Sequence, residues 1–187
     1  MPKIVVVYHS GYGHTKKAAE AVARGAEGVS GAEVTLINAV DVADDFSAFA
    51  PPDAIIFGAP TYMGGPSAEF KKFIDAASKV WFRQGWKDKV AAGFTNSGGL
   101  SGDKLNTLQC LYTNAMQHGM IWVGQAEMVG GTTPNDVNRL SSFTGLMTQS
   151  DPKTSPEETP PAGDLKTAEM FGARVATITA QFIKGRA

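Results

Sequence analysis

The chain has 187 residues with a single cysteine, and its 17 basic and 18 acidic residues give a formal net charge of −1. The lone Cys110 excludes an intramolecular disulfide, and the absence of long single-sign charge runs argues against a nucleic-acid surface or a basic membrane patch. Because the N-terminus already has a strand pattern and no apolar stretch could span a bilayer, we expect no leader peptide, no membrane anchor and a cytoplasmic location.

Strand and helix patterns alternate along the chain, which is typical of an α/β protein with a parallel sheet. Short apolar, β-branched runs predict five strands, at residues 4–8, 33–37, 54–58, 90–94 and 120–123. Helical spacing of apolar residues predicts helices near 15–26, 67–80 and 103–118, and a last helix that begins with Asp164 as its N-cap. These elements predict one domain over 1–187, built on a doubly wound five-stranded parallel sheet of order 2-1-3-4-5 with helices on both faces.

One long region, about 124–163, carries no convincing element, although Val137 to Met147 is compatible with a helical turn. A loop of this length in a compact domain is usually functional or disordered. Its second half, from Asp151 to Pro161, is polar and proline-rich and would suit disorder. Its first half contains several large apolar residues, so we expect that half to pack against the rest of the protein.

Three unusual loops follow the predicted first, third and fourth strands. They are Ser10–Thr15, Pro60–Pro66 and Asn96–Gly102, and each combines glycines with hydroxyl or amide side chains. In an open α/β sheet, ligands bind outside the carboxyl ends of the strands, where the strand order reverses. The first loop also leads into a helix N-terminus, which favours a phosphate. The three loops together therefore predict one ligand site at this edge of the sheet.

Other phosphate and catalytic motifs are excluded by their spacing. A dinucleotide fingerprint would need a third glycine where Lys16 stands, and the second strand ends without an acidic residue for a ribose. The chain has no P-loop sequence, and around Ser101 the second glycine of a nucleophile elbow comes one place early. Three histidines without helical or strand pairing make no zinc site, so no metal is predicted.

Two of these loops resemble the flavin-binding loops of the flavodoxin superfamily. Tyr8–Thr15 resembles its FMN-phosphate loop, and Ile55–Tyr62 resembles its second flavin loop. The sequence His118–Val123 is similar to a motif of one branch, the WrbA-type NAD(P)H:quinone oxidoreductases. The resemblance extends from Lys3 to the last helix and implies a flavodoxin-like fold with bound FMN.

The resemblance also implies roles for particular residues. The FMN phosphate would be held by Ser10, Tyr12, Gly13, His14 and Thr15. The isoalloxazine ring would lie along Pro60, Thr61, Tyr62, Met63 and Gly64, and its other side would be flanked by Asn96, Ser97, Gly98 and Gly99. Trp81 matches a tryptophan that comes from a neighbouring subunit to wall the site.

His118 is the catalytic candidate, since the resemblance places it beside the pyrimidine end of the flavin. A histidine there could donate a hydrogen bond or carry positive charge, which would favour the fully reduced flavin. Simpler alternatives stay open for three residues. His118 could be a cation at a helix C-terminus, His14 could merely occupy a helix start, and Trp81 could be a core or interface aromatic residue.

The resemblance implies an enzyme that transfers hydride from NADH or NADPH through FMN to a quinone or similar small acceptor. It also implies a homo-oligomer, although the insert of this branch after the second strand is shorter here, at Ala39–Pro52, which leaves a dimer as well as a tetramer. One alternative is a flavodoxin-type electron carrier without small-molecule turnover, against which the small net charge argues mildly. Another is a flavin-binding regulatory or scaffold protein.

Overall fold

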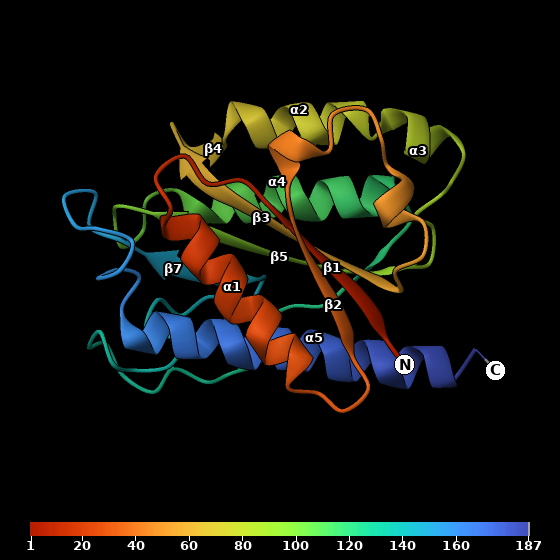
Figure 1. Cartoon of the computed structure of the whole chain (residues 1–187). Coiled ribbons are helices and arrows are strands. Elements are labelled where there is room, and N and C mark those ends of the chain that lie inside the picture. Colours follow the sequence, from red (N-terminus) through yellow and green to blue (C-terminus); the bar gives the residue numbers. More distant parts are fainter. Residues whose placement is uncertain (187) are drawn as a thin grey trace.

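Apolar, β-branched segments form the centre of a parallel sheet in the computed structural model, which describes residues 1–186 (Figure 1). The strands β1 (Lys3–Tyr8), β3 (Ala54–Tyr62) and β5 (Val90–Ser97) lie side by side, all parallel. β2 (Glu33–Asn38) flanks β1 at one edge, and β6 (Ile121–Trp122) pairs with β5 at the other. The order β2-β1-β3-β5-β6 confirms the predicted order 2-1-3-4-5, because β5 and β6 are the predicted fourth and fifth strands.

The fifth position of the sheet is shared by two short strands. β6 pairs only with the start of β5, whereas β7 (Leu146–Gln149) pairs with its last four residues, 94–97. β7 corrects the prediction that 124–163 lacks regular structure, and Val137–Leu140 forms a turn and not a helix. A further two-residue strand, β4 (Gly65–Pro66), pairs antiparallel with the end of β3.

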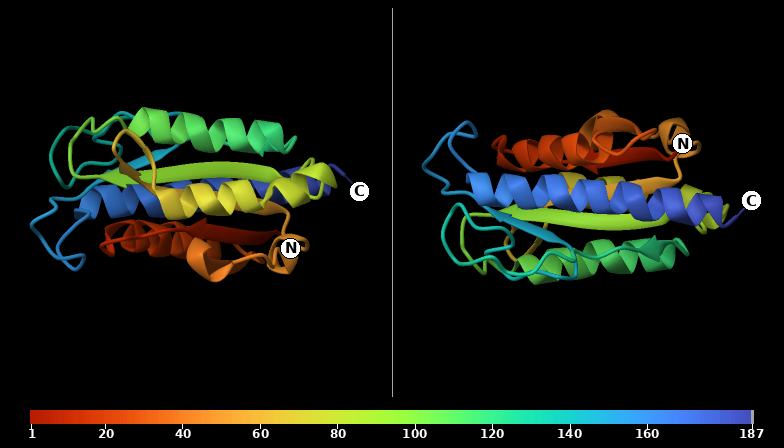
Figure 2. Two further views of the ribbon diagram at one scale, coloured as in Figure 1. Left: turned by 90° about the horizontal axis from the view of Figure 1, so that it is seen from above. Right: turned by 90° about the horizontal axis from the view of Figure 1, so that it is seen from below.

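Helices cover both faces of the sheet, as predicted. The two views of Figure 2 show α1 (His14–Glu27) and α5 (Ala162–Lys184) over one face, and α2 (Ala68–Ala76) with α4 (Lys104–Gln117) over the other. Alternate residues of each strand enter the two cores: in β1, Val6 packs toward α1 and α5, while Val5 packs toward α2 and α4. No helix within residues 1–186 has the length and apolar character to cross a membrane.

Several element boundaries differ from those predicted. The helix predicted over 67–80 is two helices, α2 and α3 (Ser78–Phe82), with Ala77 between them. Two short 3-10 turns, η1 (Ala39–Asp41) and η2 (Ser47–Phe49), lie between β2 and β3. Asp164 is not an N-cap, because α5 begins two residues earlier and the Asp164 carboxylate is buried in its first turn.

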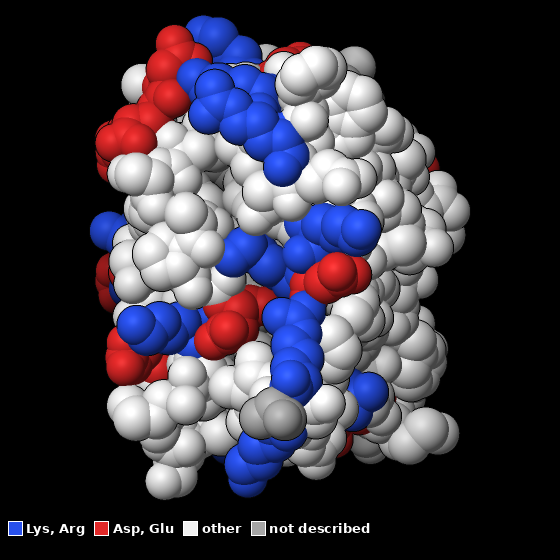
Figure 3. Space-filling view, turned by 90° about the vertical axis from the view of Figure 1, so that its right-hand side faces the viewer, with Lys and Arg blue, Asp and Glu red and all other residues white. Residues whose placement is uncertain are grey.

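The strand ends gather the three predicted loops at one edge of the molecule, at the left in Figure 1, with both termini at the opposite end. β3 and β5 continue several residues beyond their predicted ends, to Tyr62 and Ser97. Figure 3 views the molecule from the opposite end, where Lys and Arg side chains lie among Asp and Glu side chains. The charged side chains of that face are therefore remote from the loops.

Candidate functional site

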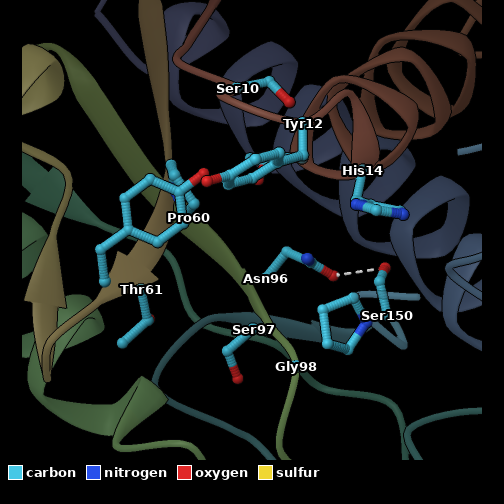
Figure 4. A pocket seen from close by; sticks show the side chains of 12 residues that line it. Ser10, Tyr12, His14, Pro60, Thr61, Asn96, Ser97, Gly98 and Ser150 are labelled. Carbon is cyan, nitrogen blue, oxygen red and sulfur yellow. Dashed lines mark hydrogen bonds between the residues drawn. The ribbon is translucent and has the colours of Figure 1, made fainter. Parts of the chain in front are cut away.

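The three loops converge on a cavity of about 390 Å³ at the carboxyl ends of β1, β3 and β5 (Figure 4). Its walls consist of Ser10, Tyr12, His14, Thr15, Pro60, Thr61, Tyr62, Asn96, Ser97, Gly98, Ser150 and Pro152. All of these are predicted site residues except Ser150 and Pro152, which belong to the long segment after β6. The described residues of this lining include no aspartate, glutamate, lysine or arginine.

The start of α1 forms one end of the cavity and is open to an anion. Gly13 stands at the N-cap with φ of +90°, and no side chain caps the helix. The Ser10 hydroxyl accepts a hydrogen bond from the Gly13 N–H at 3.0 Å, which holds the loop in a tight turn. Because the first N–H groups of a helix have no intrahelical partners, this end offers donors and a positive dipole to a phosphate.

The segment from Ser150 to Pro160 covers the same helix start. His14 Nε2 lies 3.0 Å from the carbonyl oxygen of Thr154, so this nitrogen donates. Lys17 and Glu157 form an ion pair at 2.8 Å, and a Cβ on Gly13 would come within 2.6 Å of Pro156. The polar, proline-rich half that would suit disorder thus lies ordered against α1, because contacts distant in sequence hold it there.

Asn96 presents an amide group to the cavity in a fixed orientation. Its Oδ1 accepts hydrogen bonds from Thr148 Oγ1 at 2.8 Å and from Ser150 Oγ at 3.0 Å, the latter drawn in Figure 4. Within residues 1–186 its Nδ2 has no acceptor, so both of its N–H donors are free for a ligand. Thr148 and Ser150 were not predicted as site residues, because they become neighbours of Asn96 only through the pairing of β7 with β5.

The hydroxyls of two predicted residues are occupied inside the protein. Thr61 Oγ1 lies 2.8 Å from Thr95 Oγ1 and 2.7 Å from Thr107 Oγ1, in a buried cluster. Ser97 Oγ donates to the Gly99 carbonyl at 3.1 Å and accepts from the Lys104 ammonium. These side chains therefore fix the walls of the cavity, and their hydroxyls are not free for a ligand.

Two tyrosines stand at the mouth of the cavity. The rings of Tyr12 and Tyr62 meet edge to face, with centroids 6.1 Å apart and an interplanar angle of 72°. Tyr12 is 76 % exposed, and burial together with the neighbouring Tyr12 raises the pKa of Tyr62. The predicted residues Gly13, Met63, Gly64 and Gly99 are not part of the cavity lining. Met63 is fully exposed beside Tyr62.

His118 does not lie at the cavity of its own chain, so its predicted place beside a flavin stays a prediction. His118 is the C-cap of α4, whose opposite end lies at the cavity, and a helix of 14 residues is about 21 Å long. Its ring packs on Trp86 at a centroid distance of 4.3 Å, and its Nδ1 has no hydrogen-bond partner among residues 1–186. Burial lowers the pKa of His118 to about 4, so it is a neutral core histidine.

Trp81 lies outside the cavity as well, on α3. It is 42 % exposed, and the adjacent Phe82 is 83 % exposed. Whether Trp81 walls the site of a neighbouring subunit stays a prediction. No group of three or more histidine, cysteine, aspartate or glutamate side chains within 1–186 could hold a metal ion.

The chain is similar to several known proteins along most of its length. The family model described as NADPH-dependent FMN reductase matches residues 46–133. Flavodoxin FldP of Pseudomonas aeruginosa (strain UCBPP-PA14) is 44 % identical over 184 residues, which cover 97 % of this chain and 98 % of that protein. A protein of Geotalea daltonii named NAD(P)H dehydrogenase (quinone) is 31 % identical, with 98 % of this chain and 100 % of that protein covered.

Two solved structures are also similar to this chain. The crystal structure of the flavodoxin, WrbA-like protein from Agrobacterium tumefaciens shares 46 % sequence identity, covers 97 % of this chain and 99 % of its own, and superposes with a TM-score of 0.73. A flavodoxin from the domain Archaea, at 22 % identity, shares the fold with a TM-score of 0.66.

Proposed function

Since the chain belongs to the flavodoxin superfamily and is WrbA-like within it, we propose that it binds FMN and transfers hydride from NADH or NADPH to a quinone or a similar small acceptor. We place this reaction in the cytoplasm, as the sequence suggests. FMN supplies the hydride chemistry when it is bound, and the residues of this chain bind it, orient it and exclude water.

The phosphate end of the cofactor fits the start of α1. The uncapped N–H groups, the left-handed Gly13 and the hydroxyls of Ser10 and Thr15 form a cradle for an anion there. His14 holds the covering segment through Thr154, so its part is to close this end of the site. A phosphate of matching size would satisfy donors that the protein leaves unpaired.

The ring end fits between two walls of the cavity. Pro60 to Tyr62 form one wall, and Asn96 to Gly98 form the other. The free amide donors of Asn96 face the cavity and suit the carbonyl and nitrogen acceptors of a flavin.

The composition of the cavity mouth favours small-molecule substrates. Its rim carries exposed aromatic and apolar side chains, Tyr12, Tyr62 and Met63, and the lining is uncharged. Planar substrates such as a nicotinamide or a quinone stack on such surfaces. A docking site for charged protein partners would instead present charged residues around the opening.

Rapid mixing of the FMN-loaded protein with NADH and with NADPH tests the proposal. We expect at least one of them to bleach the flavin absorbance, and subsequent addition of a benzoquinone to restore it. If neither nucleotide bleaches the flavin within minutes, the hydride-transfer proposal fails.

A second candidate is an electron carrier without small-molecule turnover, favoured by the 44 % identity to a protein named a flavodoxin. A carrier would be reduced by a flavodoxin reductase plus NADPH but not by NADPH alone. The same rapid-mixing measurement, made with NADPH alone and with NADPH plus the reductase, distinguishes the two functions.

A further inference from the structure

A fully buried lysine stands directly behind the cavity wall. Lys104 is 0 % exposed, and its ammonium donates to Ser97 Oγ at 2.8 Å, to the Gly99 carbonyl at 2.6 Å and to the Leu100 carbonyl at 2.9 Å. All three acceptors are neutral, so no carboxylate contacts this charge. Lys104 is also the first residue of α4, where the helix dipole is already positive.

The charged groups that face Lys104 do not neutralise it. They are Asp164 from α5 and Arg139 from the segment between β6 and β7. Arg139 and Asp164 are buried and bonded to each other, with Nε 2.7 Å from Oδ1 and a second contact at 3.1 Å. Because these two charges compensate one another, the cluster of Lys104, Arg139 and Asp164 retains one net positive charge.

The same cluster holds the backbone of the cavity wall. Gln149 accepts from Arg139 at 3.0 Å and donates through Nε2 to the Gly98 carbonyl at 2.9 Å. The carbonyls from Gly98 to Leu100 are therefore all engaged by Gln149 or Lys104. In contrast, the N–H groups of these three residues have no acceptor within residues 1–186, and Gly98 lines the cavity.

A buried, uncompensated cation is costly unless an anion offsets it. The cavity in front of Ser97, the residue whose hydroxyl accepts from Lys104, leaves room for one. We propose that Lys104 is a positioning and electrostatic residue of the flavin site, whose charge, set against Arg139 and Asp164, favours the reduced, more negative state of the bound ring. This assigns to Lys104 the charge effect that the family resemblance implied for His118, and it rests on the proposed binding of FMN.

Two substitutions of opposite charge effect test this proposal by redox titration of the FMN-loaded protein at pH 7. Lys104→Gln keeps hydrogen-bond donors but removes the charge, so the two-electron midpoint potential should fall. Asp164→Asn adds one net positive charge, so the potential should rise. A unit charge roughly 10 Å away changes the ratio of reduced to oxidised flavin about tenfold, or about 30 mV for two electrons.

The matched control is Lys166→Gln, which removes an exposed charge on α5 paired only with Glu169. Solvent screens such a charge, and its substitution should leave the potential unchanged. A merely structural role of the cluster would not move the potential in opposite directions for Lys104→Gln and Asp164→Asn. Unchanged potentials in both variants, or a fall in both, would overturn the proposal.

A pH series gives a second readout that survives if Lys104→Gln does not fold. Burial lowers the pKa of Lys104 to about 8, while Asp164 raises it and Arg139 lowers it. The charge is therefore present at pH 7 and lost at higher pH, where the wild-type potential should approach that of the variant. Asp164→Asn should keep its raised potential on both sides of this transition, because Arg139 stays charged there. A wild-type potential that shows no additional fall between pH 7 and pH 10, beyond that of free FMN, would contradict the role of Lys104.

Riboflavin, which lacks the phosphate, separates the ring from the phosphate as the group that senses the charge. The proposal predicts that Lys104→Gln weakens the binding of oxidised FMN and of riboflavin by the same small factor. A loss of affinity confined to FMN would place the charge at the phosphate and overturn the assignment. Failure of the wild-type protein to bind FMN at all would instead refute the proposed function.

Discussion

Gly13 shows how one residue determines whether the phosphate end can form. Its φ of +90° lies in the region that residues with a Cβ avoid, and an added Cβ would collide with Pro156 at 2.6 Å. The same residue is the N-cap of α1, whose first residues, His14 and Thr15, line the cavity. Anion binding at this end of the site therefore requires the left-handed backbone conformation of Gly13.

Gly13→Ala should weaken FMN binding at least tenfold and lower the thermal midpoint, because strain at such a position costs about 1–3 kcal/mol. Titration of the apoprotein with FMN and a melting curve measure both effects. Gly28→Ala at the other end of α1 is the control, since its φ is −65° and its Cβ would meet ordinary contacts near 3.4 Å. Equal affinities of the two variants would contradict the role of Gly13.

His118 contributes to pH-dependent stability at the far end of α4. Its pKa falls from 6.5 to about 4 through burial, so between these values the unfolded chain binds a proton that the folded protein does not. Stability is therefore lost as the pH falls through this window. His118→Phe removes the titrating group and keeps an aromatic ring against Trp86.

We expect the loss of unfolding free energy between pH 7 and pH 5 to be about 2 kcal/mol smaller in His118→Phe than in wild type. Urea unfolding at several pH values measures it. Parallel pH profiles of wild type and His118→Phe would show that His118 is not a buried neutral histidine.

Among the elements, the segment between β6 and β7 depends on one buried ion pair. Arg139 lies in this segment, and Asp164 lies at the start of α5. Only 6 % of the Arg139 side chain and 2 % of the Asp164 side chain are exposed. Asp164 also accepts the Gln149 N–H at 2.8 Å, which joins β7 to α5. The pair thus holds the segment, β7 and α5 in one register beside the cavity.

Arg139→Met should lower the unfolding free energy by about 3–5 kcal/mol, because it leaves the Asp164 carboxylate buried without a partner. Urea unfolding measures the change, and Asp164→Asn in the same chain should restore part of it. The control Arg24→Met breaks a half-exposed pair with Glu169 and should cost under about 1 kcal/mol. Similar losses from the two arginine variants would contradict this account.

The strands were predictable where their residues are uniformly apolar, as in Val5–Val7 and Ile55–Phe57. Their ends were not, because the ladder continues through polar residues such as Asn96 and Ser97 once a neighbouring strand is present. β7 was not predicted either. Its four residues mix apolar and polar types, and its partner in β5 lies about fifty residues earlier in the chain.

At the scale of the whole molecule, the exposed pair Trp81 and Phe82 favours association of copies of this chain. Large aromatic side chains exposed side by side usually mark an interface. They lie on α3, away from the chain's own cavity, so any contact of Trp81 with a flavin must be made in another copy.

Light scattering at micromolar concentration should therefore show a dimer or tetramer, and the double substitution Trp81→Ser and Phe82→Ser should reduce the measured mass. Val40→Ser, at another exposed apolar residue, is the control and should leave the mass unchanged. A monomeric wild-type protein would remove the basis for an intersubunit role of Trp81.

The sequence by itself determined the order of the main strands, the helices on both faces and the three loops at one edge, because local periodicity and glycine spacing encode them. It also determined most of the cavity lining. The tertiary structure alone decided that Ser150 and Pro152 join the site, that His118 lies at the far end of α4, and that Lys104 stands behind Ser97. These outcomes depend on long-range strand pairing and on the rigid length of a helix, and neither has a signature within a short stretch of sequence.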